Sequence, residues 1–247
     1  FAKVGGLADV AGALPKALKA LGHDVRVVMP AYRAQEELGR QGKLTARPGG
    51  LIVPTGHGPV AAGIYEGTLP GSDVPIYFIA QASLFDRPNV YGYDDDAYRF
   101  AFFSRAVFEL INVLGWRPDI LHAHDWHTAP AVTWLATAGQ SDERTRGLPS
   151  IFTIHNLAHQ GLVDPGLFFS WTGLPWSLFH MEALEFYGRV NQMKGGIVFA
   201  RRVTTVSPSY AEEIQTPEFG MGLDGVLRRH AGKLRGILNG LDTEVFD

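Results

Sequence analysis

The sequence predicts an α/β protein built on a doubly wound, Rossmann-like parallel sheet with a β-hairpin insertion. Helical and strand-like stretches alternate along most of the chain, which is typical of a parallel sheet with crossover helices. Several strand-like runs are apolar throughout, as in strands that are buried on both faces. One region breaks this rhythm with short runs separated by Gly and Pro, and predicts antiparallel hairpins. We find no internal repeat and no low-complexity linker, so we expect a single domain over residues 1–247.

Residues 1–30 predict a loop, a helix and then a strand. Apolar residues recur at helical spacing over 7–21, and Gly22 follows where a C-cap glycine ends a helix. Pro15 lies inside this pattern, so we expect it to kink or break the helix. The apolar, β-branched run at 25–29 predicts a strand of a parallel sheet.

The loop before this helix has the composition of a phosphate-binding loop. Gly5 and Gly6 lack a Cβ, so a ligand could approach the backbone there, and Lys3 adds a cation beside the first-turn N–H groups. The alternative is an ordinary Gly-Gly turn next to a solvated lysine.

Composition limits the classes of partner. The chain has 247 residues, of which 46% are hydrophobic and 19% charged, so it can bury a sizeable core. Its net charge of -3 gives no basic excess, so we expect neither a nucleic-acid nor a membrane partner. The absence of cysteine fits a cytoplasmic location. Because the chain begins at Phe1 with a loop and helix, we expect the first strand of the sheet, and any targeting segment, to lie outside it.

The next part of the chain should contain the insertion. Residues 31–47 predict a polar connection that is either helical or irregular. Residues 49–81 predict hairpins with apolar runs at 51–53, 60–65 and 74–79. Residues 85–96 form a loop dense in aromatic and acidic side chains, followed by a helix over 97–114 that stops at Gly115. Capping and the helix dipole explain part of the acidity before that helix, and ligand recognition is the other explanation.

The second half predicts further alternating elements. Ser207 and Pro208 are typical of an N-cap and a first helical position. In open α/β sheets ligands bind at the carboxyl ends of the strands, which directs attention to the loops that follow 119–123 and 149–154. The predicted strands are 119–123, 149–154, 202–206 and 233–238, and the predicted helices are 129–138, 178–187, 192–200, 210–214 and 222–230.

The loop after 119–123 is rich in histidine. His122, His124, Asp125 and His127 lie within six residues, which suggests a metal site. Their order, H-x-H-D-x-H, differs from the H-x-H-x-D-H run of the metallo-β-lactamase type. We therefore interpret His122 as a hydrogen-bonded core histidine and Asp125 as a cap of the following helix, and expect no metal and no cofactor.

Six motifs in order resemble those of the bacterial glycogen synthases and plant starch synthases. They are KVGGLADVAGALPKAL, YGYDDDAYRFAFFSRA, HAHDWHTA, FTIHNLAHQG, VSPSYAEEI and ILNGLDTEVF, and together they span nearly the entire chain. The resemblance implies one half of a GT-B glycosyltransferase, in which two Rossmann-like domains face a cleft. It implies retaining transfer of glucose from ADP-glucose to the non-reducing end of an α-1,4-glucan. The chain resembles only the N-terminal, acceptor-side domain, so the C-terminal nucleotide-binding domain would be its partner.

The resemblance also implies roles for individual residues. Lys3 would contact the donor phosphate, helped by the backbone of Gly5 and Gly6. Asp95 would bind sugar hydroxyls, and His127 would place its imidazole and its backbone carbonyl near the transferred glucose. Other positions would line or border the cleft: Asp9 near the first turn, His155, Asn156 and Gln160 on the acceptor side, and Asn239 where the chain turns toward the second domain.

One departure from the family and three alternatives remain open. The family often has Asp-Asn where this chain has Asp95-Asp96, so the extra carboxylate either alters hydrogen bonding to the sugar or caps the helix. A related transferase could use another nucleotide sugar, because the base pocket would lie in the second domain. A metallohydrolase would use His122, His124 and His127. A non-catalytic glucan-binding module would keep the loop at 91–96. Because a sandwiched donor needs groups from both domains, we expect the chain alone to be inactive.

Overall fold

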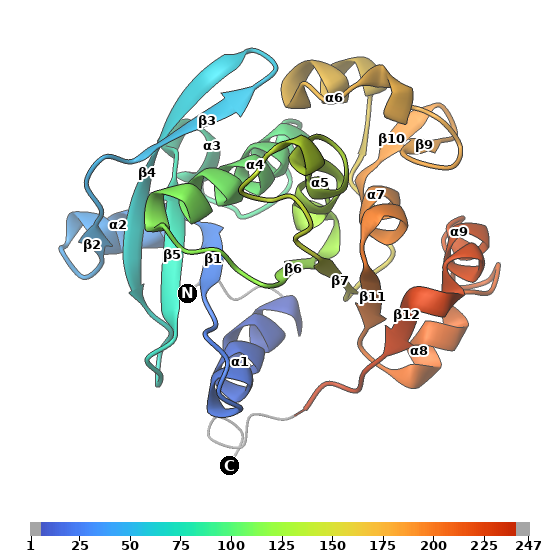
Figure 1. The fold of residues 1–247 in the computed structure, drawn as a ribbon, viewed down its shortest axis with the longest axis horizontal. Coiled ribbons are helices and arrows are strands. Elements are labelled where there is room, and N and C mark those ends of the chain that lie inside the picture. Colours follow the sequence, from blue (N-terminus) through green and yellow to red (C-terminus); the bar gives the residue numbers. More distant parts are fainter. Residues whose placement is uncertain (1–5, 241–247) are drawn as a thin grey trace. The chain divides into compact units, whose positions relative to one another are not determined.

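The computed structural model describes residues 6–240, which fold as two compact units (Figure 1). Among the described residues, the first unit contains 6–53 and 59–99, and the second contains 54–58 and 100–240. Each unit has a sheet and a hydrophobic core of its own.

The first unit opens with α1 (Gly6–Ala20), where the sequence predicts a helix. Pro15 lies inside α1 and is buried, and the helix continues through it, so the expected break does not occur. A proline removes a single backbone donor, and burial of its ring provides apolar contact in return. Gly22, with φ 93°, follows the helix in the left-handed conformation that glycine adopts readily.

The sheet of the first unit contains the predicted hairpins. Its strands are β1 (Val27–Pro30), β2 (Thr45–Ala46), β3 (Leu51–Thr55), β4 (Gly58–Thr68) and β5 (Pro75–Ala80). The order is β1-β5-β4-β2, with β3 also paired to β4. β4 runs antiparallel to β5 and β2, whereas β1 runs parallel to β5. The hairpin prediction is therefore confirmed, and β1 forms an edge of this sheet within the described part of the chain.

Three helices lie within or directly after this part of the chain, and the third belongs to the second unit from Phe100 onward. α2 (Arg33–Arg40) lies in the stretch predicted to be a polar connection, helical or irregular, and α3 (Ala82–Phe85) precedes the acidic loop. α4 (Asp96–Leu114) ends before Gly115, which has φ 57°, as predicted. The core of the first unit is formed by Ala31, Leu44, Leu69, Val74, Ile76 and Phe78.

The sheet of the second unit is fully parallel. Its strands are β6 (Leu121–His124), β7 (Ser150–Ile154), β11 (Arg202–Thr205) and β12 (Leu234–Gly236), in the order β12-β11-β7-β6. All four lie where the sequence predicts strands, although β6 begins two residues later than expected and includes His124. The α/β class with a parallel sheet is therefore confirmed.

Two helices pack tightly beside this sheet (Figure 1). They are α5 (Asp125–Ala136) and α7 (Gln192–Phe199). A Cβ on Gly195 would lie 2.6 Å from Thr133 Oγ1, and one on Gly196 would overlap the Phe152 ring. Glycine disfavours helices because of its backbone entropy, so the close approach explains why two glycines stand in α7.

The C-terminal helices follow the predicted caps. In α8 (Pro208–Glu213) the Ser207 hydroxyl accepts a hydrogen bond from the Tyr210 N–H, and Pro208 occupies the first turn. α9 (Asp224–Arg229) is shorter than the predicted helix at 222–230. The prediction of an N-cap at Ser207 is confirmed.

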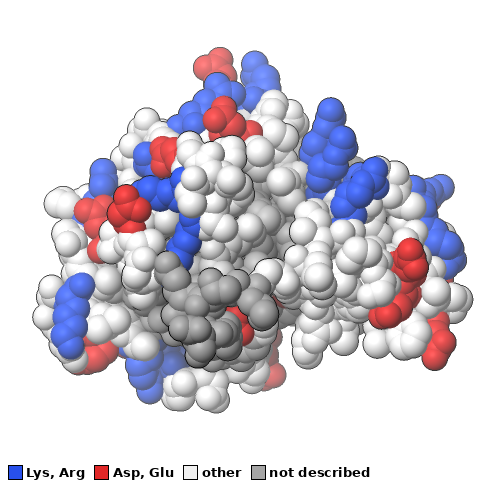
Figure 2. All heavy atoms as spheres, turned by 90° about the horizontal axis from the view of Figure 1, so that it is seen from below, with Lys and Arg blue, Asp and Glu red and all other residues white. Residues whose placement is uncertain are grey.

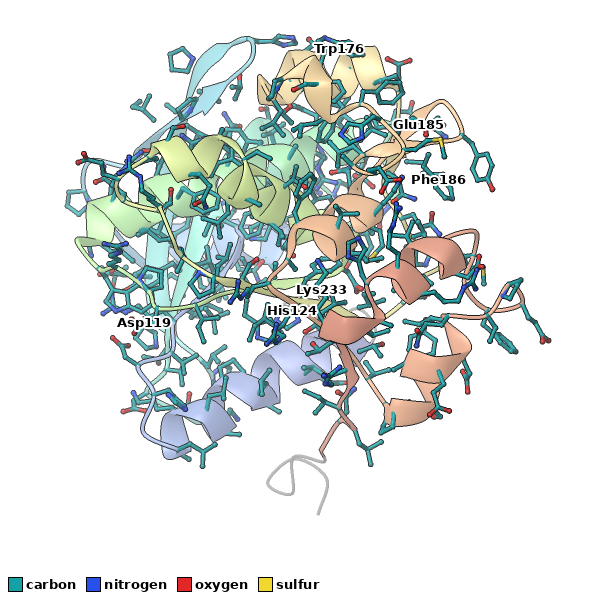
Figure 3. All side chains as sticks on the ribbon, turned by 45° about the vertical axis from the view of Figure 1, so that its right-hand side comes forward. Asp119, His124, Trp176, Glu185, Phe186 and Lys233 are labelled. Atoms are coloured by element: carbon teal, nitrogen blue, oxygen red, sulfur yellow. The ribbon has the colours of Figure 1, made fainter. Side chains whose placement is uncertain are left out.

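The prediction of a helix over 178–187 is wrong. The chain instead forms a short 3-10 helix (Trp176–Leu178) and then β9 (Glu185–Phe186), which pairs with β10 (Arg189–Asn191). Both residues of β9 are labelled in Figure 3. Tyr187 and Gly188 have positive φ and reverse the chain between these strands. Together with β8 (Leu162–Val163) they form a small sheet in the order β8-β10-β9.

A helix that the sequence analysis missed lies between β8 and this hairpin. α6 (Pro165–Thr172) begins after Asp164, whose side chain accepts a hydrogen bond from the Leu167 N–H, and ends at Gly173 with φ 67°. An N-cap aspartate, a proline at the first position and a C-cap glycine are a readable helix signature.

The surface fits the modest net charge. On the face drawn in Figure 2, basic and acidic side chains are interspersed, and neither sign forms a continuous patch. Within residues 6–240, none of the helices has the length and apolar character that a membrane span requires.

Candidate functional site

The carboxyl ends of β6 and β7 bring two histidines together. His124 ends β6 and is labelled in Figure 3, and His155 follows β7 directly. Because these strands are parallel neighbours, both side chains emerge at the same edge of the sheet. His124 Nδ1 lies 3.0 Å from His155 Nε2, so the two imidazoles share a hydrogen bond.

His122 lies behind this pair in a chain of polar groups that crosses the sheet. Its Nε2 is 2.7 Å from Thr153 Oγ1, which is 2.7 Å from Thr204 Oγ1. Burial lowers the pKa of the His122 imidazole to about 4. The interpretation of His122 as a hydrogen-bonded core histidine is confirmed.

The three imidazoles are neutral at pH 7. The rings of His122 and His124 stack with their centroids 4.2 Å apart. Burial, and then the neighbouring His122 and His155, hold the pKa of His124 well below its usual range. Burial, followed by the influence of His122, lowers the pKa of His155 to about 4. Each neutral imidazole carries one N–H donor and one acceptor, so these side chains can form hydrogen bonds but cannot act as cations.

Asp125 does not cap α5, contrary to the prediction. His124 occupies the N-cap position, and Asp125 is the first helical residue with φ 56°. The Asp125 carboxylate accepts hydrogen bonds from the backbone N–H groups of His155, at 2.8 Å, and Asn156, at 3.4 Å. Burial raises the pKa of Asp125 to about 6, against the lowering effect of these two N–H groups. Its side chain thus holds the loop after β7.

His127 belongs to the first turn of α5, so its expected place on a loop is wrong. Its ring centroid lies 4.7 Å from that of Phe100 and 4.3 Å from that of Trp126. Burial lowers the pKa of the His127 imidazole to about 3. The Ser104 hydroxyl donates a hydrogen bond to the His127 carbonyl at 3.2 Å, so one lone pair of that carbonyl is already used.

The remaining predicted residues of this unit differ in exposure. Asn156 is exposed, and its Oδ1 accepts a hydrogen bond from the Ala158 N–H. Gln160 is buried: its Oε1 accepts from Asn191 Nδ2 at 2.6 Å, and its Nε2 donates to the Met221 carbonyl at 3.0 Å. Both polar ends of the Gln160 side chain therefore stabilise the unit itself. Asn239 is exposed, and its N–H donates to the Val206 carbonyl.

Asp95 lies in the first unit and forms an ion pair that the sequence analysis missed. Arg87 Nη1 is 2.6 Å from Asp95 Oδ1, and Arg87 Nη2 is 2.7 Å from Asp95 Oδ2. These bonds hold the pKa of Asp95 below its usual range. The Arg87 guanidinium also lies 4.8 Å from the Tyr93 ring centroid. Because both of its oxygens accept hydrogen bonds from the Arg87 guanidinium, the Asp95 carboxylate is ionised and has a fixed orientation.

Asp96 supports the loop in front of α4. Its Oδ2 accepts from the N–H groups of Gly92 and Tyr93, and its Oδ1 accepts from Arg99 Nη1 at 2.5 Å. Arg99 is fully buried and also donates to backbone carbonyls of the loop and of α3. Of the two explanations for the extra carboxylate, these contacts favour the structural one.

The predicted phosphate loop falls largely outside the described residues. Lys3 and Gly5 lie there, whereas Gly6 is the first residue of α1. Among residues 6–240, no atom lies within 4 Å of the position that a Cβ on Gly6 would take. Asp9 is exposed in the first turn of the same helix.

The described residues do not support the metal hypothesis. Among them, no three His, Cys, Asp or Glu side chains are gathered so that they could hold a metal ion. His122 Nε2 and His124 Nδ1 take part in separate hydrogen bonds, and His127 packs against Phe100. The metallohydrolase alternative therefore lacks a ligand set in this part of the chain.

A parallel α/β unit with polar side chains at the carboxyl ends of its strands fits the GT-B class of glycosyltransferases. Residues 1–229 match the family model described as "Starch synthase catalytic domain". The chain therefore belongs to this family.

Curated relatives and a solved structure agree with this assignment. The chain is 58% identical over 252 residues to a glycogen synthase of Thermus thermophilus, covering all of this chain and 50% of that protein. It is 47% identical to glycogen synthase 1 of Geobacter sulfurreducens, with the same coverage. The catalytic domain of starch synthase IV from Arabidopsis thaliana, solved bound to ADP and acarbose, superimposes with a TM-score of 0.89 at 35% identity. It too is covered to 50%, so the chain spans about half the length of these relatives.

Proposed function

We propose that this chain forms the N-terminal, acceptor-side domain of a retaining glucosyltransferase that elongates an α-1,4-glucan from ADP-glucose. The observation that carries the proposal is identity of 58% along the entire chain with a glycogen synthase. The Arabidopsis relative was solved with ADP and acarbose, which fits a nucleotide-sugar donor and a glucan acceptor. A C-terminal domain would supply the nucleotide pocket, and the reaction would take place in the cytoplasm.

The chemistry assigns different tasks to the two ends of the donor. When the bond between glucose and the diphosphate breaks, negative charge gathers on the leaving phosphate and positive charge on the sugar ring. Lys3, the backbone of Gly5 and Gly6, and the N-terminus of α1 would stabilise the phosphate. Carbonyl and carboxylate oxygens would face the sugar.

The residues near the sugar would act as fixed hydrogen-bonding groups. Asp95 is ionised and held by Arg87, so its remaining lone pairs can accept hydrogen bonds from sugar hydroxyls. His127 is neutral, with a pKa of about 3, so it would donate or accept one hydrogen bond without moving a proton. His155 and Asn156 would border the acceptor side, with Asp9, Gln160 and Asn239 around the cleft.

The proposal is tested by incorporation of radiolabelled glucose into glycogen by the chain joined to its natural flanking sequence. We expect incorporation from ADP-glucose. UDP-glucose, assayed in parallel, tests the identity of the base, and transfer from UDP-glucose alone would identify a related transferase. Failure with both donors, together with retained glucan binding, would support a glucan-binding module instead.

A further inference from the structure

Two consecutive residues, the last of β6 and the first of α5, hold the same residue of the loop after β7. His124 contacts the His155 ring, with Nδ1 3.0 Å from Nε2. Asp125 accepts a hydrogen bond from the His155 backbone N–H at 2.8 Å. The contact with His124 restrains the His155 ring, and the contact with Asp125 restrains the His155 backbone. Together they fix both the position and the ring plane of His155.

The local conformation at Asp125 is one that few residues with a Cβ adopt. Its φ of 56° lies in the left-handed region, where the Cβ approaches the following carbonyl. The buried carboxylate also loses hydration. Helix α5 could begin without a positive φ and without a buried carboxylate. The hydrogen bonds from the His155 and Asn156 N–H groups, however, require the Asp125 carboxylate to point toward the loop after β7.

The shared hydrogen bond couples the tautomers of the two histidines. In the neutral pair one nitrogen must donate and the other accept. If His124 Nδ1 carries the proton, His155 Nε2 is the acceptor and its own proton resides on Nδ1. If His155 donates through Nε2, its Nδ1 is a bare acceptor. In either case the direction of the hydrogen bond to His124 determines whether Nδ1 of the half-buried His155 ring donates or accepts.

We propose that His124 and Asp125 are positioning residues for His155, so that its Nδ1 meets a substrate hydroxyl in a single tautomer and orientation. The identity of that substrate, a glucan hydroxyl, rests on the proposed function. The positioning itself rests on the hydrogen bonds at the ends of β6 and β7. His122 packs behind His124 and reaches Thr153, away from His155.

The proposal is tested with three variants in the protein with its natural flanking sequence. His124→Phe keeps a ring that can stack on His122 but removes the hydrogen bond to His155. His124→Asn restores a polar atom close to the position of Nδ1. His122→Phe is the matched control, because it removes the bond to Thr153 from the same stack and leaves the His124–His155 contact intact.

Two readouts separate positioning from a purely structural role. In ¹⁵N spectra of histidine-labelled protein, His155 should show one protonated and one bare nitrogen in the wild type and in H122F, and averaged signals in H124F. The kcat for glucosyl transfer should fall about tenfold in H124F, stay within about twofold in H122F, and largely recover in H124N. The melting temperatures of H124F and H122F should fall by similar amounts, because both lose one buried hydrogen bond.

Some outcomes would overturn the positioning role. These are a single His155 tautomer retained in H124F, averaged His155 signals in the wild type, or equal loss of kcat in H124F and H122F. The wild-type spectrum decides by itself if H124F does not fold. If the wild type transfers no glucose from ADP-glucose, the proposed function fails, and the spectra still decide whether His124 fixes His155.

Discussion

Acidification should destabilise the second unit through its buried histidines. The pKa values of His122 and His155 are about 4 in the folded chain, and that of His127 is about 3, against 6.5 for the unperturbed side chain. The unfolded chain therefore binds more protons than the folded chain below pH 6.5, and stability falls as the pH falls toward 4. At pH 4.5 each of these three imidazoles should remove about 2–3 kcal/mol from the free energy of unfolding.

Protonation of Asp125 opposes the loss of stability that the histidines cause at low pH. Its pKa is raised from 3.8 to about 6, so the folded chain binds this proton first, and at pH 4.5 the carboxyl should restore about 2 kcal/mol. The expected net loss between pH 7 and 4.5 is about 6 kcal/mol, which is comparable with the whole stability of many domains.

Urea unfolding followed by circular dichroism at pH 7, 6, 5 and 4.5 measures this loss. In the same series, His122→Gln should reduce the loss of stability between pH 7 and 4.5 by about 2–3 kcal/mol, because one titrating group is gone. His23 is exposed, so His23→Gln is the matched control for a histidine-to-glutamine change at the surface. A free energy of unfolding that stays constant or rises toward pH 4.5 would refute this account of the histidines.

Four further outcomes are expected. Gly196→Ala should cost about 1–3 kcal/mol in urea unfolding, because the new methyl group overlaps the Phe152 ring, whereas Gly232→Ala should cost little. Arg87→Met should lower kcat/KM about tenfold by freeing Asp95, with partial recovery in Arg87→Lys; equal kinetics in all three would exclude a positioning role for Arg87. Lys3→Ala should reduce kcat/KM for ADP-glucose by about one to two decades, and unchanged kinetics would exclude the phosphate contact. Transfer should survive EDTA, and loss that zinc reverses would favour the metallohydrolase.

The structure changes what is expected of His127→Ala. A histidine on a loop would contribute little to stability, but this ring is buried between Phe100 and Trp126. Its removal should therefore lower the melting temperature as well as turnover, because the cavity is lined by aromatic rings. His127→Phe, which fills the space without a hydrogen-bonding atom, separates the two effects: stability largely retained with turnover lost would indicate a role in binding.

Local signals in the sequence predicted much of the fold. The Ser207-Pro208 cap, the stop at Gly115 and the four parallel strands follow from patterns that lie within a few residues of one another. The hairpin at Tyr187 was missed because a tyrosine with positive φ is rare, and the apolar run around it also fits a helix. Helix α6 was readable from its caps.

The candidate site was less predictable, because its contacts join residues far apart in sequence. Asp125 resembles a helix cap by its position, and its true partners lie 30 and 31 residues away. Arg87 and Asp95 are eight residues apart in an irregular loop, where no periodicity indicates which side chains meet. Gln160 is polar and follows a strand, yet burial directs both ends of its carboxamide into the fold.

The central claim is that this chain is one half of a glucosyltransferase. The measurement that tests it most directly compares radiolabelled glucose incorporation into glycogen from ADP-glucose by the chain alone and by the chain joined to its natural flanking sequence. Under the proposal that groups from two domains enclose the donor, incorporation is expected only by the longer protein. Clear incorporation by the 247-residue chain alone would contradict the claim.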